Sequence, residues 1–261
     1  MKRFEGKTVF VSGGSKGIGL ACAKRMASEG SNVFLVASNT ERLKSAMETI
    51  QSQGPAEIGF HAADLRTEDG CNSAAAACLD HFGGCNIFIH SAGATKGGIF
   101  PDQPDEEMLD GFALKFHAGV RLARALWPSL KQSHGTVINI VGGFARTPAA
   151  DFMVGGAVNA ALANFTKALA EKGLQDDVNV TWIHPGLTTT ERLETIFADR
   201  AEQQDKSLEQ IQQEAVAAEG IRRLGCPEDV SELVAFLCSP EARHIHGGGI
   251  SIDGGGAKGY W

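Results

Sequence analysis

Tyrosine is almost missing from this chain of 261 residues, whose one tyrosine, Tyr260, is the residue before the last. A reaction that needs a phenol from the middle of the chain as its acid or base is therefore excluded. Tyr260 could still reach the site of a neighbouring subunit if the C-terminal segment crosses over. A flexible tail is the simpler interpretation of a terminal residue.

Paired cysteine spacings are also missing. Without them the sequence predicts neither a disulfide framework nor a metal site. We expect the cysteines to be reduced and to pack as small apolar residues. They are Cys22, Cys71, Cys78, Cys85, Cys226 and Cys238.

Long runs of positive charge or of apolar residues do not occur. The formal net charge is -7 and no Lys/Arg run is present, so nucleic acid and anionic membranes are poor partners. No stretch is long and apolar enough to cross a membrane, and Met1 to Gly6 lead into a strand without a signal-length segment. We expect a cytoplasmic protein that binds a small-molecule substrate.

Short apolar runs, by contrast, recur along the whole chain and alternate with helix-length patterns. Such runs predict buried parallel strands with helices on both faces of the sheet. We expect residues 1–261 to form one α/β domain, a Rossmann-type doubly wound parallel sheet of about seven strands, with ligands at the carboxyl ends of the strands. The runs span residues 8–11, 33–37, 59–63, 87–90, 136–140, 178–183 and 249–252.

Residues 191–222 differ in being polar and rich in Glu, Gln and Ala, with few apolar positions. This pattern predicts one or two surface helices. They could form a solvated hairpin or a mobile lid over a substrate. Because the segment directly follows the Pro185 to Thr190 turn, we favour the helical lid.

A glycine-rich turn follows the first apolar run and opens an Ala-rich helix pattern. Its spacing is Gly13-x3-Gly17-x-Gly19, which differs from the commoner dinucleotide fingerprint. Glycines at such a turn let the backbone approach a pyrophosphate, and the N-terminus of a helix favours its charge. The turn predicts a nucleotide site.

Further turns follow later strands in a fixed order. Asp64 ends the third run, His90-Ser91-Ala92-Gly93 end the fourth, Pro185-Gly186 and Thr190 follow the sixth, and Asp253-Gly254-Gly255 follow the last. With the glycine turn, this series resembles the short-chain dehydrogenase/reductase family over essentially the full length. The resemblance implies a seven-stranded parallel sheet, a nicotinamide cofactor and a homotetramer or homodimer.

The resemblance also assigns cofactor contacts. By position, Asp64 would contact the adenine, Ala92 and Gly93 would line the adenosine side, and Thr190 would face the nicotinamide amide. Taken singly, each could be a turn residue or a cap. The full set of predicted cofactor residues is Ser12, Gly13, Ser15, Lys16, Gly17, Ile18, Gly19, Ser38, Asn39, Asp64, Leu65, Ser91, Ala92, Gly93, Lys115, Asn159, Pro185, Gly186, Thr188 and Thr190.

The cofactor's phosphate preference depends on the end of the second run. A carboxylate there would bond the ribose 2′-hydroxyl and repel a 2′-phosphate, but the chain has Ala37-Ser38-Asn39. The arginine that the family often has at the position of Ser38 is missing. Lys16 could pair with a 2′-phosphate or be a solvated loop lysine. We favour NADP(H) over NAD(H).

The family's catalytic set is a serine after the fifth strand, a Tyr-x3-Lys on the next helix and an asparagine on the helix before. Here these positions hold Gly142, Gly155, Asn159 and Lys115, in that order. The asparagine and lysine look exchanged, which could keep one ammonium and one amide near the nicotinamide ribose. The two glycines would leave open space. Loss of activity is the alternative, although an unpaired lysine is costly to bury, which favours a retained role for Lys115.

Other acid–base candidates are weaker. His117 is two residues past Lys115 and so lies on another helix face, where a structural role is expected. His184 is expected to be a packed turn residue. Asp151 and Arg146 could meet a polar substrate or be solvated.

These patterns lead to one main functional hypothesis, an NAD(P)-dependent oxidoreductase of the short-chain type with an altered active site. Hydride could pass to or from a carbonyl/alcohol, with Lys115 as acid, base or electrostatic stabiliser, or to an enone with water as the proton source. A substrate with its own acidic group could also fill the space beside the glycines. The alternative is a catalytically inactive NAD(P)-binding regulatory or structural subunit. The Ala/Gly-rich helix from Gly155 to Ala170 would allow the close helix approach of an oligomer.

Overall fold

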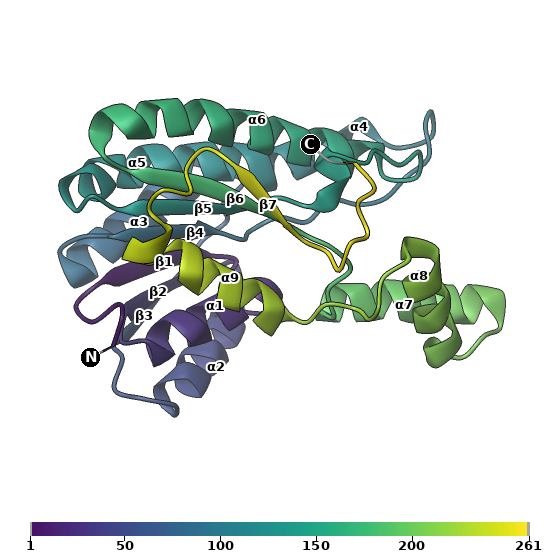
Figure 1. Cartoon of the computed structure of the whole chain (residues 1–261), viewed down its shortest axis with the longest axis horizontal. Helices are drawn as coiled ribbons and strands as arrows, with labels where there is room; N and C mark the ends of the chain where they lie inside the picture. The colour runs from purple at the N-terminus through teal and green to yellow at the C-terminus, as the bar shows by residue number, and fades with distance from the viewer. Residues whose placement is uncertain (1, 260–261) are drawn as a thin grey trace.

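A computed structural model describes residues 2–259 and places one parallel sheet at the centre of the molecule (Figure 1). The strand order is β3-β2-β1-β4-β5-β6-β7, so the chain reverses its direction of growth between β1 and β4. The expected doubly wound sheet is confirmed, and the carboxyl ends of β1 and β4 form its switch point. The strands are β1 (Thr8–Ser12), β2 (Asn32–Ala37), β3 (Ile58–Ala62), β4 (Ile87–His90), β5 (Thr136–Ile140), β6 (Asn179–Pro185) and β7 (Gly249–Ile252).

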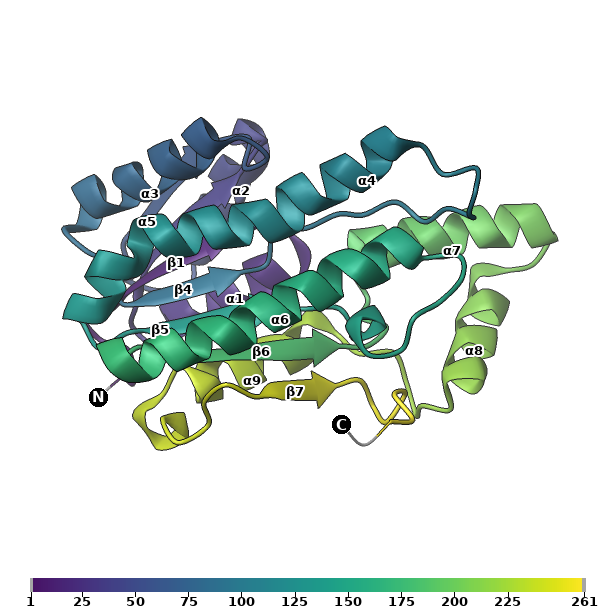
Figure 2. The same cartoon turned by 90° about the horizontal axis from the view of Figure 1, so that it is seen from above.

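Helices cover both faces of the sheet (Figures 1 and 2). One face carries α1 (Gly17–Ser28), α2 (Thr40–Gln51) and α9 (Pro227–Leu237), which share one apolar cluster. The other carries α3, α5 and α6, which share a second cluster. The bounds on this side are α3 (Glu68–Phe82), α4 (Asp105–Gly111), α5 (Ala118–Gln132) and α6 (Met153–Asp176), with short helical turns at Phe112–His117 and Gly143–Ala145 and, near α9, at Pro240–Ala242.

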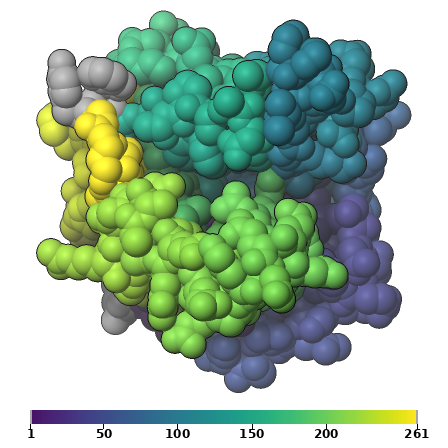
Figure 3. All heavy atoms as spheres, turned by 90° about the vertical axis from the view of Figure 1, so that its right-hand side faces the viewer, coloured from purple at the N-terminus to yellow at the C-terminus, as the bar shows by residue number. Residues whose placement is uncertain are grey.

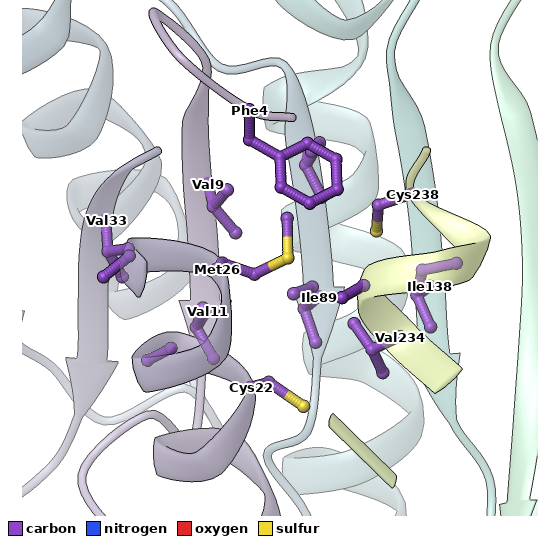
Figure 4. Packing of buried hydrophobic residues seen from close by; sticks show 14 of the residues in the cluster. Phe4, Val9, Val11, Cys22, Met26, Val33, Ile89, Ile138, Val234 and Cys238 are labelled. Carbon is purple, nitrogen blue, oxygen red and sulfur yellow. The ribbon is translucent and has the colours of Figure 1, made fainter. Parts of the chain in front are cut away.

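The strands are apolar at successive positions because both faces are buried. Val9 and Val11 point into the cluster with Cys22 and Met26 of α1 (Figure 4), whereas Phe10 between them belongs to the other cluster. Side chains of a strand alternate between the two faces, so a strand covered twice has no polar side. This is the physical origin of the apolar runs in the sequence.

Residues 191–222 form α7 (Glu191–Gln204) and α8 (Leu208–Glu219), which project from the body of the molecule (Figures 1 and 2). Thr190 caps α7, and a capping box of Ser207 and Gln210 begins α8. The two helices contact each other, and each buries a single residue. Few apolar contacts tie this segment to the sheet, as its polar sequence led us to expect.

Within residues 2–259 no helix is long and apolar enough to span a membrane, and no group of three metal-ligating side chains is found. All six cysteines are free thiols and only Cys226 is partly exposed. Burial raises the pKa of the Cys22 thiol to about 12, so it packs as a small neutral residue.

Candidate active site

The glycine turn between β1 and α1 packs tightly against the end of β4. Gly13 has φ +68°, and a Cβ there would lie 2.8 Å from the backbone nitrogen of Ala92. A Cβ at Gly19 would lie 2.2 Å from the carbonyl oxygen of Gly13. Both positions therefore require glycine, one for its conformation and both for the close approach.

The N-terminus of α1 suits a phosphate group. Lys16 makes no side-chain cap, and the first turn of the helix holds no acidic residue. The first N–H groups of a helix have no partner within it, and the helix dipole adds positive potential there. The residues of the turn thus fit the pyrophosphate of a dinucleotide.

A buried hydrogen-bond chain connects the glycine turn to the helix that carries Lys115. The Ser12 hydroxyl accepts from the backbone N–H groups of Ser91 and Ala92, and donates to Nδ1 of His90 over 2.8 Å. Nε2 of His90 then donates to the Lys115 carbonyl oxygen over 2.8 Å. Ser12, predicted as a cofactor residue, directs its hydroxyl into this chain instead.

Lys115 lies in a π-helical turn, Phe112–His117. Its carbonyl oxygen accepts the hydrogen bond from His90. This turn closes with the N–H of Ala118 bonded to the carbonyl oxygen of Ala113, five residues back. Such turns are rare in proteins overall, and those that occur are often found at functional sites. Burial lowers the pKa of His90 to about 4, so the ring is neutral and donates from Nε2 only.

Lys115 itself lies over the end of β4. A Cβ at Gly93 would lie 2.8 Å from Cδ of Lys115, so the lysine stem covers the bare glycine backbone. The side chain is half-buried, and no carboxylate among residues 2–259 is within ion-pair distance of it. Burial, with a smaller contribution from the charge of Arg192, lowers the pKa of Lys115 to about 8. The ammonium can thus exchange its proton near neutral pH.

Both side-chain amide atoms of Asn159 are hydrogen-bonded to the backbone. Its Oδ1 accepts from the N–H of Gly142 over 2.6 Å, and its Nδ2 donates to the carbonyl oxygen of Gly155 over 2.7 Å. The side chain is buried and joins the end of β5 to α6. The structure gives this predicted cofactor contact a structural role that the spacing alone did not reveal.

The space expected beside Gly155 is filled. A Cβ on this glycine would lie 1.9 Å from Cε1 of Phe152, so the expectation of open space at this position is wrong. The Phe152 ring packs against Phe144, with centroids 4.9 Å apart. Beside Gly142 the amide of Asn159 lies 3.2 Å from where a Cβ would be. An aromatic ring therefore fills the space at Gly155 and an amide the space at Gly142.

At the opposite end of the glycine turn, two cations meet one carboxylate of α7. Nζ of Lys16 lies 3.0 Å from Oε2 of Glu191, and a guanidinium nitrogen of Arg42 lies 3.7 Å from the same atom. These three residues line a pocket of about 260 Å³, together with Ser15, Gly17, Leu20, Ser45, Ala46 and Thr49. Sequence reasoning missed Arg42. The available signal was a basic residue in the first turn of the helix after β2.

The remaining predicted cofactor residues differ in the burial of their side chains and in whether these already have hydrogen-bond partners. Oδ1 of Asp64 accepts from the N–H of Arg66 over 3.1 Å, and Oδ2 has no hydrogen bond from residues 2–259, so it could meet an adenine. Asn39, Thr188 and Thr190 are hydrogen-bonded locally, Asn39 and Thr190 as helix caps. Leu65 is buried in the core, Ser38 is exposed, and the Pro185-Gly186 turn packs on Asp253. Ile18 packs against the core beneath the turn.

The weaker acid–base candidates also differ in burial and in their hydrogen-bond partners. His184 is buried between Trp182 and the carbonyl oxygen of Val141, and burial lowers its pKa, as expected for a packed turn residue. His117 and Asp151 are exposed. Arg146 donates to the Ser251 hydroxyl over 3.2 Å. Tyr260 lies outside the described residues.

One further residue was missed in the sequence, beside the cleft that separates α7 from the segment after β4 (Figure 3). Arg192, in the first turn of α7, donates from Nη2 to the carbonyl oxygen of Thr95, in the segment after β4. Arg192 is exposed by its surface area, but partial desolvation lowers the pKa of its guanidinium. No motif marks this arginine, because its partner is a backbone atom 97 residues away in sequence.

The fold and the glycine turn together define a nucleotide-binding doubly wound protein. A family model described as "Enoyl-(Acyl carrier protein) reductase" matches residues 13–257. The chain belongs to the short-chain dehydrogenase/reductase family, so the resemblance seen in the sequence is confirmed.

Individual relatives are similar over nearly their whole length. Dehydrogenase/reductase SDR family member 4 of Caenorhabditis elegans is 28% identical, covering 97% of this chain and 96% of that protein. 3-oxoacyl-[acyl-carrier-protein] reductase FabG of Vibrio cholerae is also 28% identical, over 96% and 97%. L-sorbose reductase of Gluconobacter frateurii, solved with NADPH and L-sorbose, superposes with a TM-score of 0.95 at 28% identity, covering 99% of this chain and 100% of that one.

Proposed function

We propose that the protein is an NAD(P)-dependent oxidoreductase that transfers hydride to or from a carbonyl/alcohol or enone substrate, at a site whose acid–base group is Lys115. The observation that carries this proposal is the position of Lys115, half-buried over Gly93 without a carboxylate partner among residues 2–259. By the resemblance to the family, the end of β4 would face the cofactor, so the ammonium would lie where charge develops during reduction.

A bound nicotinamide cofactor would supply or accept the hydride. Lys115 would hold a proton on Nζ below about pH 8, stabilise the negative charge that grows on the carbonyl oxygen, and donate that proton as the alcohol forms. Phe144 and Phe152 would bound the site on its apolar side and limit the access of water.

NADP(H) is the favoured cofactor. Lys16 and Arg42 lie together at one pocket, and the strand end Ala37-Ser38-Asn39 holds no acid to repel a 2′-phosphate. The similar L-sorbose reductase was solved with NADPH, which supports the same preference here.

A nucleotide-binding protein without turnover, with a regulatory or structural role, is the second candidate. The contacts of Gly155 and Asn159 on α6 favour this candidate. Phe152 covers Gly155, and both amide atoms of Asn159 are bonded to the backbone, so neither position presents a group for proton transfer. The two candidate functions then differ in whether Lys115 transfers a proton.

Calorimetric titration with NADPH, NADP⁺, NADH and NAD⁺ tests the cofactor site first. We expect NADPH to bind more tightly than NADH, and an absence of binding by all four would overturn the oxidoreductase proposal. NADPH consumption is then measured with panels of ketones, aldehydes and enones. Binding without turnover on any panel would support the second candidate.

The lysine assignment is tested on the substrate found in that screen. Lys115→Ala is expected to lower kcat between about a hundredfold and ten-thousandfold, the usual range for loss of a general acid. Lys7→Ala, an exposed lysine before β1, serves as the matched control. Unchanged turnover in Lys115→Ala would show that another group transfers the proton.

A further inference from the structure

Arg192 connects the two walls of the cleft above the cofactor turns. It belongs to α7, which follows β6, and its Nη2 donates to the carbonyl oxygen of Thr95, which follows β4. On the face shown in Figure 3 a recess separates the green helices of this segment from the teal loops above them. The guanidinium is therefore held at the entrance to the site.

Positive charge at this entrance is not balanced. The Lys115 stem lies on Gly93, two residues before Thr95, so the ammonium and the guanidinium are held beside the same strand end. No carboxylate in residues 2–259 is within ion-pair distance of either group, and Glu191, next in sequence, faces Lys16 and Arg42.

Two further observations add to this imbalance. Arg192 lies in the first turn of α7, where the helix dipole is itself positive and disfavours a cation. The pKa of Lys115 is lowered by burial and by the charge of Arg192, as expected when two cations share a site without an anion. An anionic ligand would remove the repulsion between them.

We propose that Arg192 binds a carboxylate of the substrate, so that the protein acts on carboxylic acids whose carbonyl or hydroxyl group lies next to Lys115. The carbonyl oxygen of Thr95 takes one N–H of Nη2, which leaves the second N–H of Nη2 to form a two-donor edge with Nε or Nη1 for a carboxylate. The planar guanidinium fork matches the two oxygens of that group. This inference rests on the proposed function, because Lys115 defines where the reacting carbon lies.

The substrate is a better source of this anion than the cofactor. The cofactor's pyrophosphate has the N-terminus of α1, and a 2′-phosphate has Lys16 and Arg42. Thr95 lies beyond the cofactor-lining Gly93, toward the loop that pairs Gly98 with Phe152. Exposed Phe144 and Met153 add apolar surface from the neighbouring segment, suited to the carbon part of a substrate.

Oxalate provides a small, unreactive probe for the site. It is titrated by calorimetry into the protein saturated with NADPH, with the neutral analogue oxamide as the comparison. We expect oxalate alone to bind, and Arg192→Gln to weaken it between about tenfold and a hundredfold, the range for losing hydrogen bonds to a charged group. Arg200→Gln changes an exposed arginine of the same helix and is expected to leave oxalate affinity unchanged.

The proposal is overturned if oxalate does not bind the wild-type protein, if Arg192→Gln binds it equally well, or if oxalate binds only when NADPH is absent, since it would then occupy a cofactor phosphate site. Thermal unfolding of Arg192→Gln checks that the variant is folded. If the protein bound no NADPH, the proposed function would fail, while oxalate titration of the free wild-type and Arg192→Gln proteins would still decide whether Arg192 holds a carboxylate.

Discussion

Nε2 of His90 donates a hydrogen bond to the carbonyl oxygen of Lys115, 2.8 Å away. The same ring accepts from Ser12 at Nδ1, so a neutral imidazole joins the glycine turn to the backbone of Lys115. The glycine turn and the π-helical turn that carries Lys115 are thereby held together by one buried side chain.

His90 makes stability depend on pH in the acid range. Its pKa is lowered to about 4 in the folded state, so the unfolded chain, with a pKa near 6.5, binds the proton first. The free energy of unfolding is expected to fall by about 3 kcal/mol as the pH drops from 6.5 to 4, with no contribution above pH 7. Urea unfolding at a series of pH values measures this.

His90→Asn is the control for that dependence. An asparagine can also donate and accept at this position but does not titrate. Its unfolding free energy is expected to fall less steeply between pH 6.5 and pH 4 than that of the wild type. Equal slopes in the two proteins would show that other groups cause the acid sensitivity.

Lys115 is expected to shape the pH dependence of reduction. Because its pKa is lowered to about 8, the proton-donating ammonium dominates below pH 8 and is lost as the pH rises through that value. The kcat for carbonyl reduction should fall about tenfold per pH unit above pH 8, and that for alcohol oxidation should rise toward the same pH. A pH profile of Lys115→Arg with the same break near pH 8 would contradict this assignment.

Glu191 is expected to compete with the 2′-phosphate of NADPH. Its carboxylate faces both Lys16 and Arg42, which that phosphate would need. Exposed ion pairs contribute about 0.2–1 kcal/mol, so Glu191→Gln should tighten NADPH binding by about 1.5-fold to fivefold without changing NADH binding. Calorimetry with both cofactors measures this, and Glu194→Gln on the same helix is the control. An equal gain for NADH would place the effect elsewhere than at the phosphate.

Phe152 and Gly155 are expected to be coupled. A methyl group at Gly155 would overlap the Phe152 ring, so Gly155→Ala should destabilise the protein by about 1–3 kcal/mol despite the better helix propensity of alanine. The double variant with Phe152→Ala should recover much of that loss. A double-mutant cycle from denaturant unfolding measures the coupling, and strictly additive effects would show that the ring moves aside freely.

We propose that α6 forms a contact between subunits in a homodimer or homotetramer. Its exposed positions include Ala157, Ala160 and Ala168, whose small side chains permit close helix approach. Ala160→Arg should then shift the protein toward monomers in sedimentation velocity at micromolar concentration. Ala198→Arg on α7 is the control. A wild-type protein that sediments as a monomer would exclude this interface.

The positions of the cofactor turns could be predicted from the sequence because each depends on local rules. Gly13 and Gly19 must be glycine for backbone reasons, and the apolar runs at 8–11 and 87–90 mark strands buried on both faces. The family's order of turns then places Asp64 and Thr190 at the same edge of the sheet. The shared carboxyl ends of parallel strands guarantee this convergence.

The state of individual side chains could not be predicted in this way. Asn159 bonds the backbone of Gly142, 17 residues away, and the ring of Phe152 covers Gly155. Arg192 reaches Thr95 only because α7 and the segment after β4 lie on opposite walls of one cleft. None of these contacts has a periodicity or a motif.

The sequence by itself determined the sheet, its helices and the family, because apolar periodicity and glycine conformation act over a few residues at a time. Only the tertiary structure decided that the space beside Gly155 is filled, that Ser12 serves His90, and that Lys115 and Arg192 lie near one strand end with no carboxylate of residues 2–259 within ion-pair distance. Packing and charge depend on which distant segments meet, and that meeting is fixed only when the whole chain has folded.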